Sequence, residues 1–93
     1  MNSKRVHLLV RGRVQGVYFR QGMMETAEKN NVFGWVKNLP DDRVEAILEG
    51  NDSNVDAVVE WANFGPAGAV VKELTVTEEK HVGEFTNFTI HSQ

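Results

Sequence analysis

A glycine-containing segment near the N-terminus carries residue types that bind small anions. Residues 12–20 have the sequence Gly-Arg-Val-Gln-Gly-Val-Tyr-Phe-Arg. Gly12 and Gly16 accept backbone angles and close approaches that a side chain would block, so successive N–H groups can turn toward one anion. The segment ends at Arg20, whose planar guanidinium can hold two phosphate oxygens at once. The segment therefore predicts a phosphate site, and a tight turn followed by a surface arginine is the alternative reading of the same spacing.

A second segment contains a polar residue, Asn38, at a position where an apolar side chain is expected. Alternation along 35–39 places Trp35 and Lys37 on one face of a strand and Val36 and Asn38 on the other. An amide on an apolar face needs partners for its carbonyl and its two N–H groups. We expect Asn38 to bind a polar ligand or a water molecule, with a hydrogen bond to its own turn as the alternative.

The charge of the chain is divided unevenly along its length. The first 20 residues carry five cations and no acid, whereas the remainder carries 13 acids and five bases, which gives the net charge of −3. This division predicts a local anion site on an acidic body, which would accept a small anion and repel a long polyanion. Solvated cations along a strand edge would give the same count.

The hydropathy pattern indicates which elements must position these residues. Strand, helix, strand, strand, helix and strand follow one another, with a short tail strand at the end. This order predicts an α+β fold of the ferredoxin-like βαββαβ type, a split β-α-β sandwich in which an antiparallel sheet carries two helices on one face. The expected strands cover 6–11, 35–39, 43–48, 70–77 and 85–90, and the expected helices cover 20–31 and the stretch between a cap at Asn51 or Ser53 and a stop at Gly65.

Size and composition limit the remaining possibilities. The chain of 93 residues is 41% hydrophobic and 25% charged, which predicts a single globular domain over 1–93. Its 14 valines, against five leucines and two isoleucines, favour a sheet. The absence of cysteine excludes disulfides, thiolate metal sites and a cysteine nucleophile. With no apolar stretch of about 18 residues, we expect a cytoplasmic protein.

Taken together, the two polar segments resemble the acylphosphatase family. The resemblance rests on V-Q-G-V-x-F-R at 14–20 and G-W-V-x-N at 34–38, and Gly65-Pro66 followed by Ala69 and Val71 is similar to a third family stretch. It covers nearly the whole chain. The fold and activity that it implies are those of a small single-domain acylphosphatase.

This resemblance implies hydrolysis of the carboxyl–phosphate bond of acyl phosphates to carboxylate and inorganic phosphate, with no metal and no cofactor. Arg20 matches the family's phosphate-binding arginine, and Asn38 matches the asparagine that orients the attacking water. The implied partner is a small-molecule acyl phosphate, with no nucleic acid and no membrane, and the implied state is a monomer. The backbone N–H groups that match the phosphate-binding loop belong to Gln15, Gly16, Val17, Tyr18, Phe19 and Arg20.

Two alternatives and one departure accompany the resemblance. The first alternative is RNA binding, since the glycine and aromatic residues of the first segment are similar to the signature of RNA-recognition sheets. That signature belongs on a central strand, whereas this segment joins a strand to a helix, which argues against RNA binding. A catalytically idle module could bind a phosphorylated ligand through the same loop, although Asn38 favours catalysis. Asp42 stands where the family usually has glycine, and a turn that requires positive φ would be strained there.

Overall fold

The computed structural model describes residues 2–91, so residues 1, 92 and 93 of the expected domain lie outside the described part. Within that part, none of the helices is long and apolar enough to cross a membrane. The expected order of elements is confirmed. They are β1 (Ser3–Arg13), α1 (Phe19–Lys29), β2 (Phe33–Asn38), β3 (Val44–Asn51), α2 (Asp52–Ala62), β4 (Val70–Glu79) and β5 (Phe88–His91).

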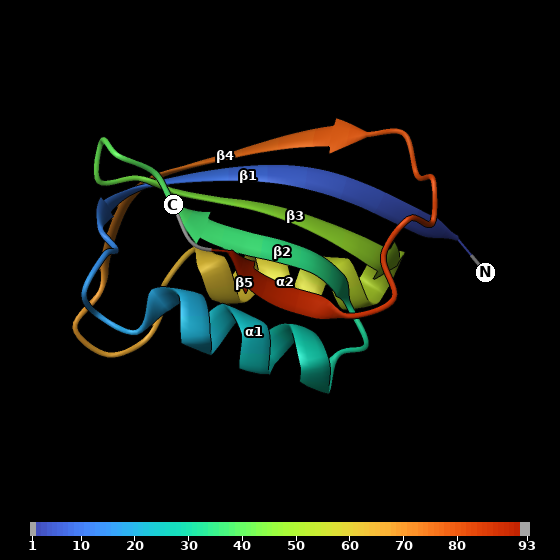
Figure 1. The fold of residues 1–93 in the computed structure, drawn as a ribbon, viewed down its shortest axis with the longest axis horizontal. Coiled ribbons are helices and arrows are strands. Elements are labelled where there is room, and N and C mark those ends of the chain that lie inside the picture. Colours follow the sequence, from blue (N-terminus) through green and yellow to red (C-terminus); the bar gives the residue numbers. More distant parts are fainter. Residues whose placement is uncertain (1, 92–93) are drawn as a thin grey trace.

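The five strands form one sheet in the order β4-β1-β3-β2-β5, and both helices cover the same face of it (Figure 1). Side chains alternate along β1, so that Val6, Leu8 and Val10 are buried against the helices. The helices complete this core from spacings of three and four residues, which place one stripe of side chains on the sheet. The buried residues of the helices are Phe19, Met23 and Ala27 in α1 and Val55, Val58 and Ala62 in α2.

The sheet differs from the expected antiparallel one at a single edge. β1 pairs antiparallel with β3 and β4, and β2 pairs antiparallel with β3, but β2 and β5 are parallel. The cause is the path of the chain. β4 ends at the end of the sheet where β2 begins, so a chain that crosses there to the opposite edge must enter β5 in the direction of β2. The sheet is therefore mixed.

The segment that crosses the sheet extends over 80–87. The last strand therefore begins at Phe88, and the prediction that it begins at residue 85 is wrong. Glu49 of β3 holds this segment by accepting hydrogen bonds from the N–H groups of Val82 and Gly83, both at 3.1 Å. Burial disfavours the charged carboxylate, but these two N–H groups and the nearby cations outweigh it and lower the pKa of Glu49. A charged Glu49 thus holds the segment that leads into β5.

Candidate active site

The loop between β1 and α1 contains two residues in the left-handed conformation. Gly16 has a φ of 72° with open space around it, and Tyr18, the residue before the helix, has a φ of 66°. Val14 and Phe19 are buried at the two ends of the loop and hold it to the core. Gly12 serves a different purpose, because a Cβ there would lie 2.1 Å from the carbonyl oxygen of Val70. Of the two glycines, Gly16 has the open space that the predicted anion site needs, whereas Gly12 permits the close approach of β4.

The start of α1 faces the same region. The first hydrogen bond of the helix runs from the Gly22 N–H to the Tyr18 carbonyl at 2.9 Å, so the N–H groups of the preceding residues have no partner within the helix. No acidic residue stands in the first turn, and no side chain caps it. Arg20 is the second residue of this helix, which puts its guanidinium at the positive end of the helix dipole.

Asn38 is the last residue of β2, and its Oδ1 atom is buried. Among the described residues, no group donates a hydrogen bond to this oxygen. A buried carbonyl without a donor is costly, which indicates that a water molecule or a ligand completes it. The turn beyond Asn38 is closed instead by the Leu39 N–H, which donates to the Arg43 carbonyl at 2.8 Å. The alternative reading of Asn38 as a turn residue therefore does not account for its Oδ1.

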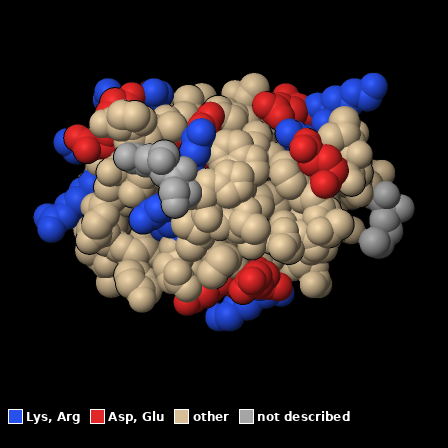
Figure 2. Space-filling view, in the orientation of Figure 1, with Lys and Arg blue, Asp and Glu red and all other residues tan. Residues whose placement is uncertain are grey.

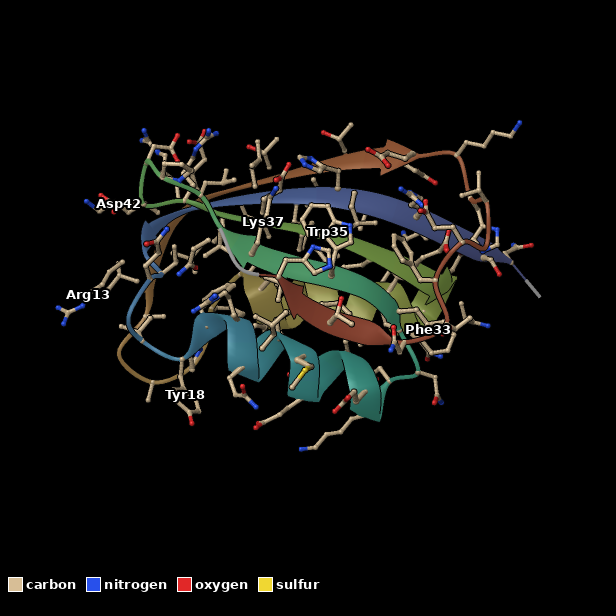
Figure 3. All side chains as sticks on the ribbon, viewed as in Figure 1. Arg13, Tyr18, Phe33, Trp35, Lys37 and Asp42 are labelled. Atoms are coloured by element: carbon tan, nitrogen blue, oxygen red, sulfur yellow. The ribbon has the colours of Figure 1, made fainter. Side chains whose placement is uncertain are left out.

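A pocket of about 450 Å³ joins the loop, the helix start and the strand end. Five of the expected site residues line it, and Arg20 and Asn38 are among them, although they come from different elements. Tyr18 lines the pocket at the start of α1 and is 76% exposed to solvent (Figure 3). The residues that line the pocket are Val14, Gly16, Tyr18, Phe19, Arg20, Gln21, Asn38 and Ile90.

The two remaining expected residues, Gln15 and Val17, lie in the loop but point elsewhere. Val17 packs against the core. Gln15 turns its amide to the β2–β3 turn, where Nε2 donates to the carbonyl oxygens of Leu39 at 2.8 Å and Arg43 at 2.9 Å. Their side chains therefore do not line the pocket.

The early cations divide into paired and unpaired groups. Lys4, Arg5 and Arg11 each form an ion pair with an acid: Lys4 with Asp56 at 2.6 Å, Arg5 with Glu84 at 2.6 Å, and Arg11 with Glu73 at 3.3 Å. Lys4 thus pairs with an acid of α2, Arg5 with one of the segment over 80–87, and Arg11 with one of β4. The alternative of solvated cations along a strand edge fits only Arg11, because β1 lies inside the sheet and the side chains of Lys4 and Arg5 are only 24% and 15% exposed. No acid of the described residues pairs with Arg20 or Arg13, and Arg13 extends outward from the end of the sheet (Figure 3).

Acidic and basic side chains are otherwise mixed on the face that Figure 2 shows, so neither sign of charge dominates it.

At the β2–β3 turn, hydrogen bonds from Arg43 lower the pKa of the Asp41 carboxyl, and a guanidinium nitrogen of Arg43 lies 2.7 Å from Oδ2 of Asp41. On the sheet, the rings of Trp35 and His91 are stacked with their centres 5.3 Å apart, and Nζ of Lys37 lies 5.4 Å from the centre of the Trp35 ring (Figure 3). The predicted alternation of β2 is thereby confirmed.

Comparison with known proteins decides the family. The acylphosphatase family model matches residues 6–90. The chain belongs to the acylphosphatase family. An acylphosphatase of Pyrobaculum arsenaticum is 52% identical over 91 residues, which cover 97% of this chain and 96% of that protein. The fold agrees as well. The crystal structure of acylphosphatase from Bacillus subtilis has a TM-score of 0.91 at 35% identity, covering 95% of this chain and 98% of that one.

A second solved structure, an acylphosphatase from Coxiella burnetii, has a TM-score of 0.91 at 33% identity and covers 97% of this chain and 94% of its own. The family expected from the two motifs and the ferredoxin-like arrangement expected from the element order are both confirmed for this acylphosphatase-family chain.

Sequence reasoning missed three of the residues that line the pocket, Val14, Gln21 and Ile90, and one feature of the loop beside it. Ile90 lines it because the crossing over 80–87 brings β5 beside β2. Gln21 lines it as the residue after Arg20 in the first turn of the helix, a neighbourhood that the motif could have signalled. The side-chain bonds of Gln15 had no signal in the sequence, because periodicity does not fix the direction of a loop side chain.

Proposed function

We propose that the chain is an acylphosphatase that hydrolyses the carboxyl–phosphate bond of small acyl phosphates to carboxylate and inorganic phosphate. Arg20 and the backbone N–H groups of residues 15–20 bind the phosphoryl group, and Asn38 holds the attacking water. The observation that carries the proposal is the pocket shared by the two motifs, in which the buried, unpartnered Oδ1 of Asn38 lies with Arg20. Family membership supports the same reaction.

The reaction needs positioning and charge stabilisation more than a strong base. Transfer of a phosphoryl group passes through a loose transition state with charge on three equatorial oxygens. In this mechanism Arg20 binds two of those oxygens through its two-pronged guanidinium, and the loop N–H groups and the start of α1 bind the remainder. The carboxylate of the substrate is a good leaving group, so no general acid is assigned.

Asn38 positions the other reactant, which is the attacking water. Its Oδ1 accepts a hydrogen bond from the water and holds it in line with the bond that breaks. As the water oxygen bonds to phosphorus, the phosphorus–oxygen bond to the carboxylate breaks and its electron pair leaves with the carboxylate. The water's proton passes to an oxygen of the bound phosphoryl group, which leaves as inorganic phosphate.

The proposed reaction requires no metal, because Arg20 and the backbone N–H groups neutralise the phosphoryl charge. The test is hydrolysis of benzoyl phosphate by the purified chain in excess EDTA, followed by titration with inorganic phosphate. We expect undiminished turnover in EDTA and competitive inhibition by phosphate. Strict dependence on added magnesium would overturn this mechanism, and phosphate binding without any turnover would assign the chain to a binding module.

We further propose that the chain acts as a single-domain monomer in the cytoplasm. All groups assigned to the reaction come from one chain within residues 15–38. The substrate is a small charged metabolite, and the pocket volume of about 450 Å³ suits a ligand of that size.

A further inference from the structure

The proposed reaction divides its two tasks between two parts of the chain that are far apart in sequence. Residues 15–20 bind the phosphoryl group, and Asn38 at the end of β2 holds the water. The distance between phosphorus and water oxygen decides the rate, since a misplacement of about 1 Å can cost 10²-fold. Some structure must therefore fix the loop relative to Asn38.

The side chain of Gln15 makes that connection. It is half-buried, and its Nε2 donates to the carbonyl oxygens of Leu39 and Arg43, at 2.8 and 2.9 Å. Both N–H bonds of the amide are thus used, and because both partners are acceptors the orientation of the amide is determined. The two carbonyls belong to the residues that close the β2–β3 turn.

Leu39 follows Asn38 directly, and Asn38 pairs with Val44 in the sheet. The position of Asn38 therefore follows the base of the turn. Beyond that base the turn is exposed over 40–42, and Asp42 has a φ of 70°. The tip of the turn thus offers little packing to hold Asn38 in place. Gln15, in contrast, is hydrogen-bonded to Leu39 at the start of the turn and to Arg43 at its end.

We propose that Gln15 is a positioning residue, whose side chain sets the distance between the phosphate-binding loop and the water held by Asn38. This inference rests on the proposed function. It is distinct from the part assigned to the Gln15 backbone N–H, because the side-chain amide donates to the carbonyl oxygens of Leu39 and Arg43 and does not line the pocket. It acts through Asn38.

The test replaces Gln15 with methionine, which keeps the length of the side chain and removes both donors. We expect kcat for benzoyl phosphate to fall about 10- to 100-fold while competitive inhibition by phosphate changes less than about threefold, since the loop N–H groups and Arg20 remain. A role confined to stability would instead lower the melting temperature and leave the kcat of the folded protein unchanged.

A double-mutant cycle separates positioning from a general structural effect. If Gln15 acts through Asn38, then Gln15→Met should cost little further activity in an Asn38→Ala background, because the water is no longer held. Additive losses would overturn the proposal. Gln15→Asn, whose amide is too short to reach both carbonyls, gives the same test should the methionine variant fail to fold.

A matched control measures the effect of lost stability alone. Asn51→Ala removes the side-chain cap of α2, in which Oδ1 accepts from the Ser53 N–H at 3.1 Å, away from the pocket. It should lower the melting temperature and leave kcat near that of the wild type. Absence of turnover in the wild type would refute the proposed function, whereas an active wild type with an equally active Gln15→Met variant would refute only the role of Gln15.

Discussion

The two helices of this protein have the same length and pack on the same face of the sheet, but they begin in opposite ways. α2 begins with Asn51, whose Oδ1 accepts a hydrogen bond from the Ser53 N–H, and Asp52 stands in its first turn. α1 begins after Tyr18 in a left-handed conformation, with no side-chain cap and no acid in the first turn. Only the start of α1 lines the pocket.

The difference shows what a binding site costs in stability. A side-chain cap contributes about 1 kcal/mol, and an acid near the N-terminus about 0.3–1 kcal/mol. α2 has both, and α1 has neither. A cap or an acid in α1 would occupy the N–H groups or repel the anion that the pocket is proposed to bind.

Arg20→Lys should be the most damaging conservative change at the start of α1. Lysine keeps the charge but loses the planar guanidinium that holds two oxygens, so we expect kcat/KM for benzoyl phosphate to fall by about 10² or more. The measurement is steady-state hydrolysis, with Arg13→Lys as the control, since Arg13 is exposed and does not line the pocket. Full activity of Arg20→Lys would show that a point charge suffices.

Asn38→Ala should separate turnover from binding. The loop and the start of α1 stay in place, so phosphate should inhibit at nearly the wild-type concentration while kcat falls by roughly 10², the scale for one lost transition-state interaction. Measurement of kcat, phosphate inhibition and thermal unfolding on the same variant checks this. A lower melting temperature with normal specific activity would instead make Asn38 a structural residue. Asn63→Ala, at an exposed helix end, is the matched control.

The sequence predicted the parts of this site that depend on local chemistry. Glycine spacing indicated the loop, and an amide on an apolar face indicated that Asn38 needs a polar partner. Alternation and helical spacing predicted the layers of the fold, because burial on one side imposes those periods. Each of these features is decided by a few neighbouring residues.

Features that depend on distant contacts were not predictable in the same way. The parallel pairing of β5 and the place of Ile90 in the pocket follow from the crossing over 80–87. The excess of early cations said nothing about their partners, and three of the five form ion pairs with acids that lie far along the chain, in α2, in the segment over 80–87 and in β4. The left-handed Tyr18 had no signal, because non-glycine residues adopt this conformation only when their surroundings impose it.

Gln21→Glu gives α1 the acid that α2 already has, and it should improve the helix while harming the site. An acid in the first turn should stabilise α1 by about 0.3–1 kcal/mol, so the melting temperature should hold or rise. The same carboxylate lines the pocket and repels phosphate, and we expect phosphate inhibition and KM to weaken roughly three- to tenfold.

Ala57→Glu is the control for Gln21→Glu, because it adds the same charge at an exposed position of α2. Thermal unfolding and phosphate inhibition should be measured on both variants. Equal phosphate inhibition in the two variants would mean that the missing acid at the start of α1 has no connection with anion binding, and the contrast between the helices would lose its functional meaning.

Asp42 is the other non-glycine residue near the site with a left-handed backbone. Asp42 has a φ of 70° in the β2–β3 turn and does not line the pocket, whereas Tyr18 has a φ of 66° and does. Asp42→Gly should therefore relieve strain without functional cost, raising the free energy of unfolding by about 0.5–1 kcal/mol at unchanged kcat.

Asp42→Ala distinguishes relief of strain from loss of charge. It removes the carboxylate but keeps the Cβ that makes positive φ unfavourable, so its stability should not rise as that of the glycine variant does. If glycine and alanine stabilise equally, the cost at residue 42 is electrostatic and not conformational. If Asp42→Gly gains stability but loses kcat, the strained turn positions Asn38. Strain would then serve the site at Asp42 as well as at Tyr18, and the functional side of the contrast between the two helix starts would extend to this turn.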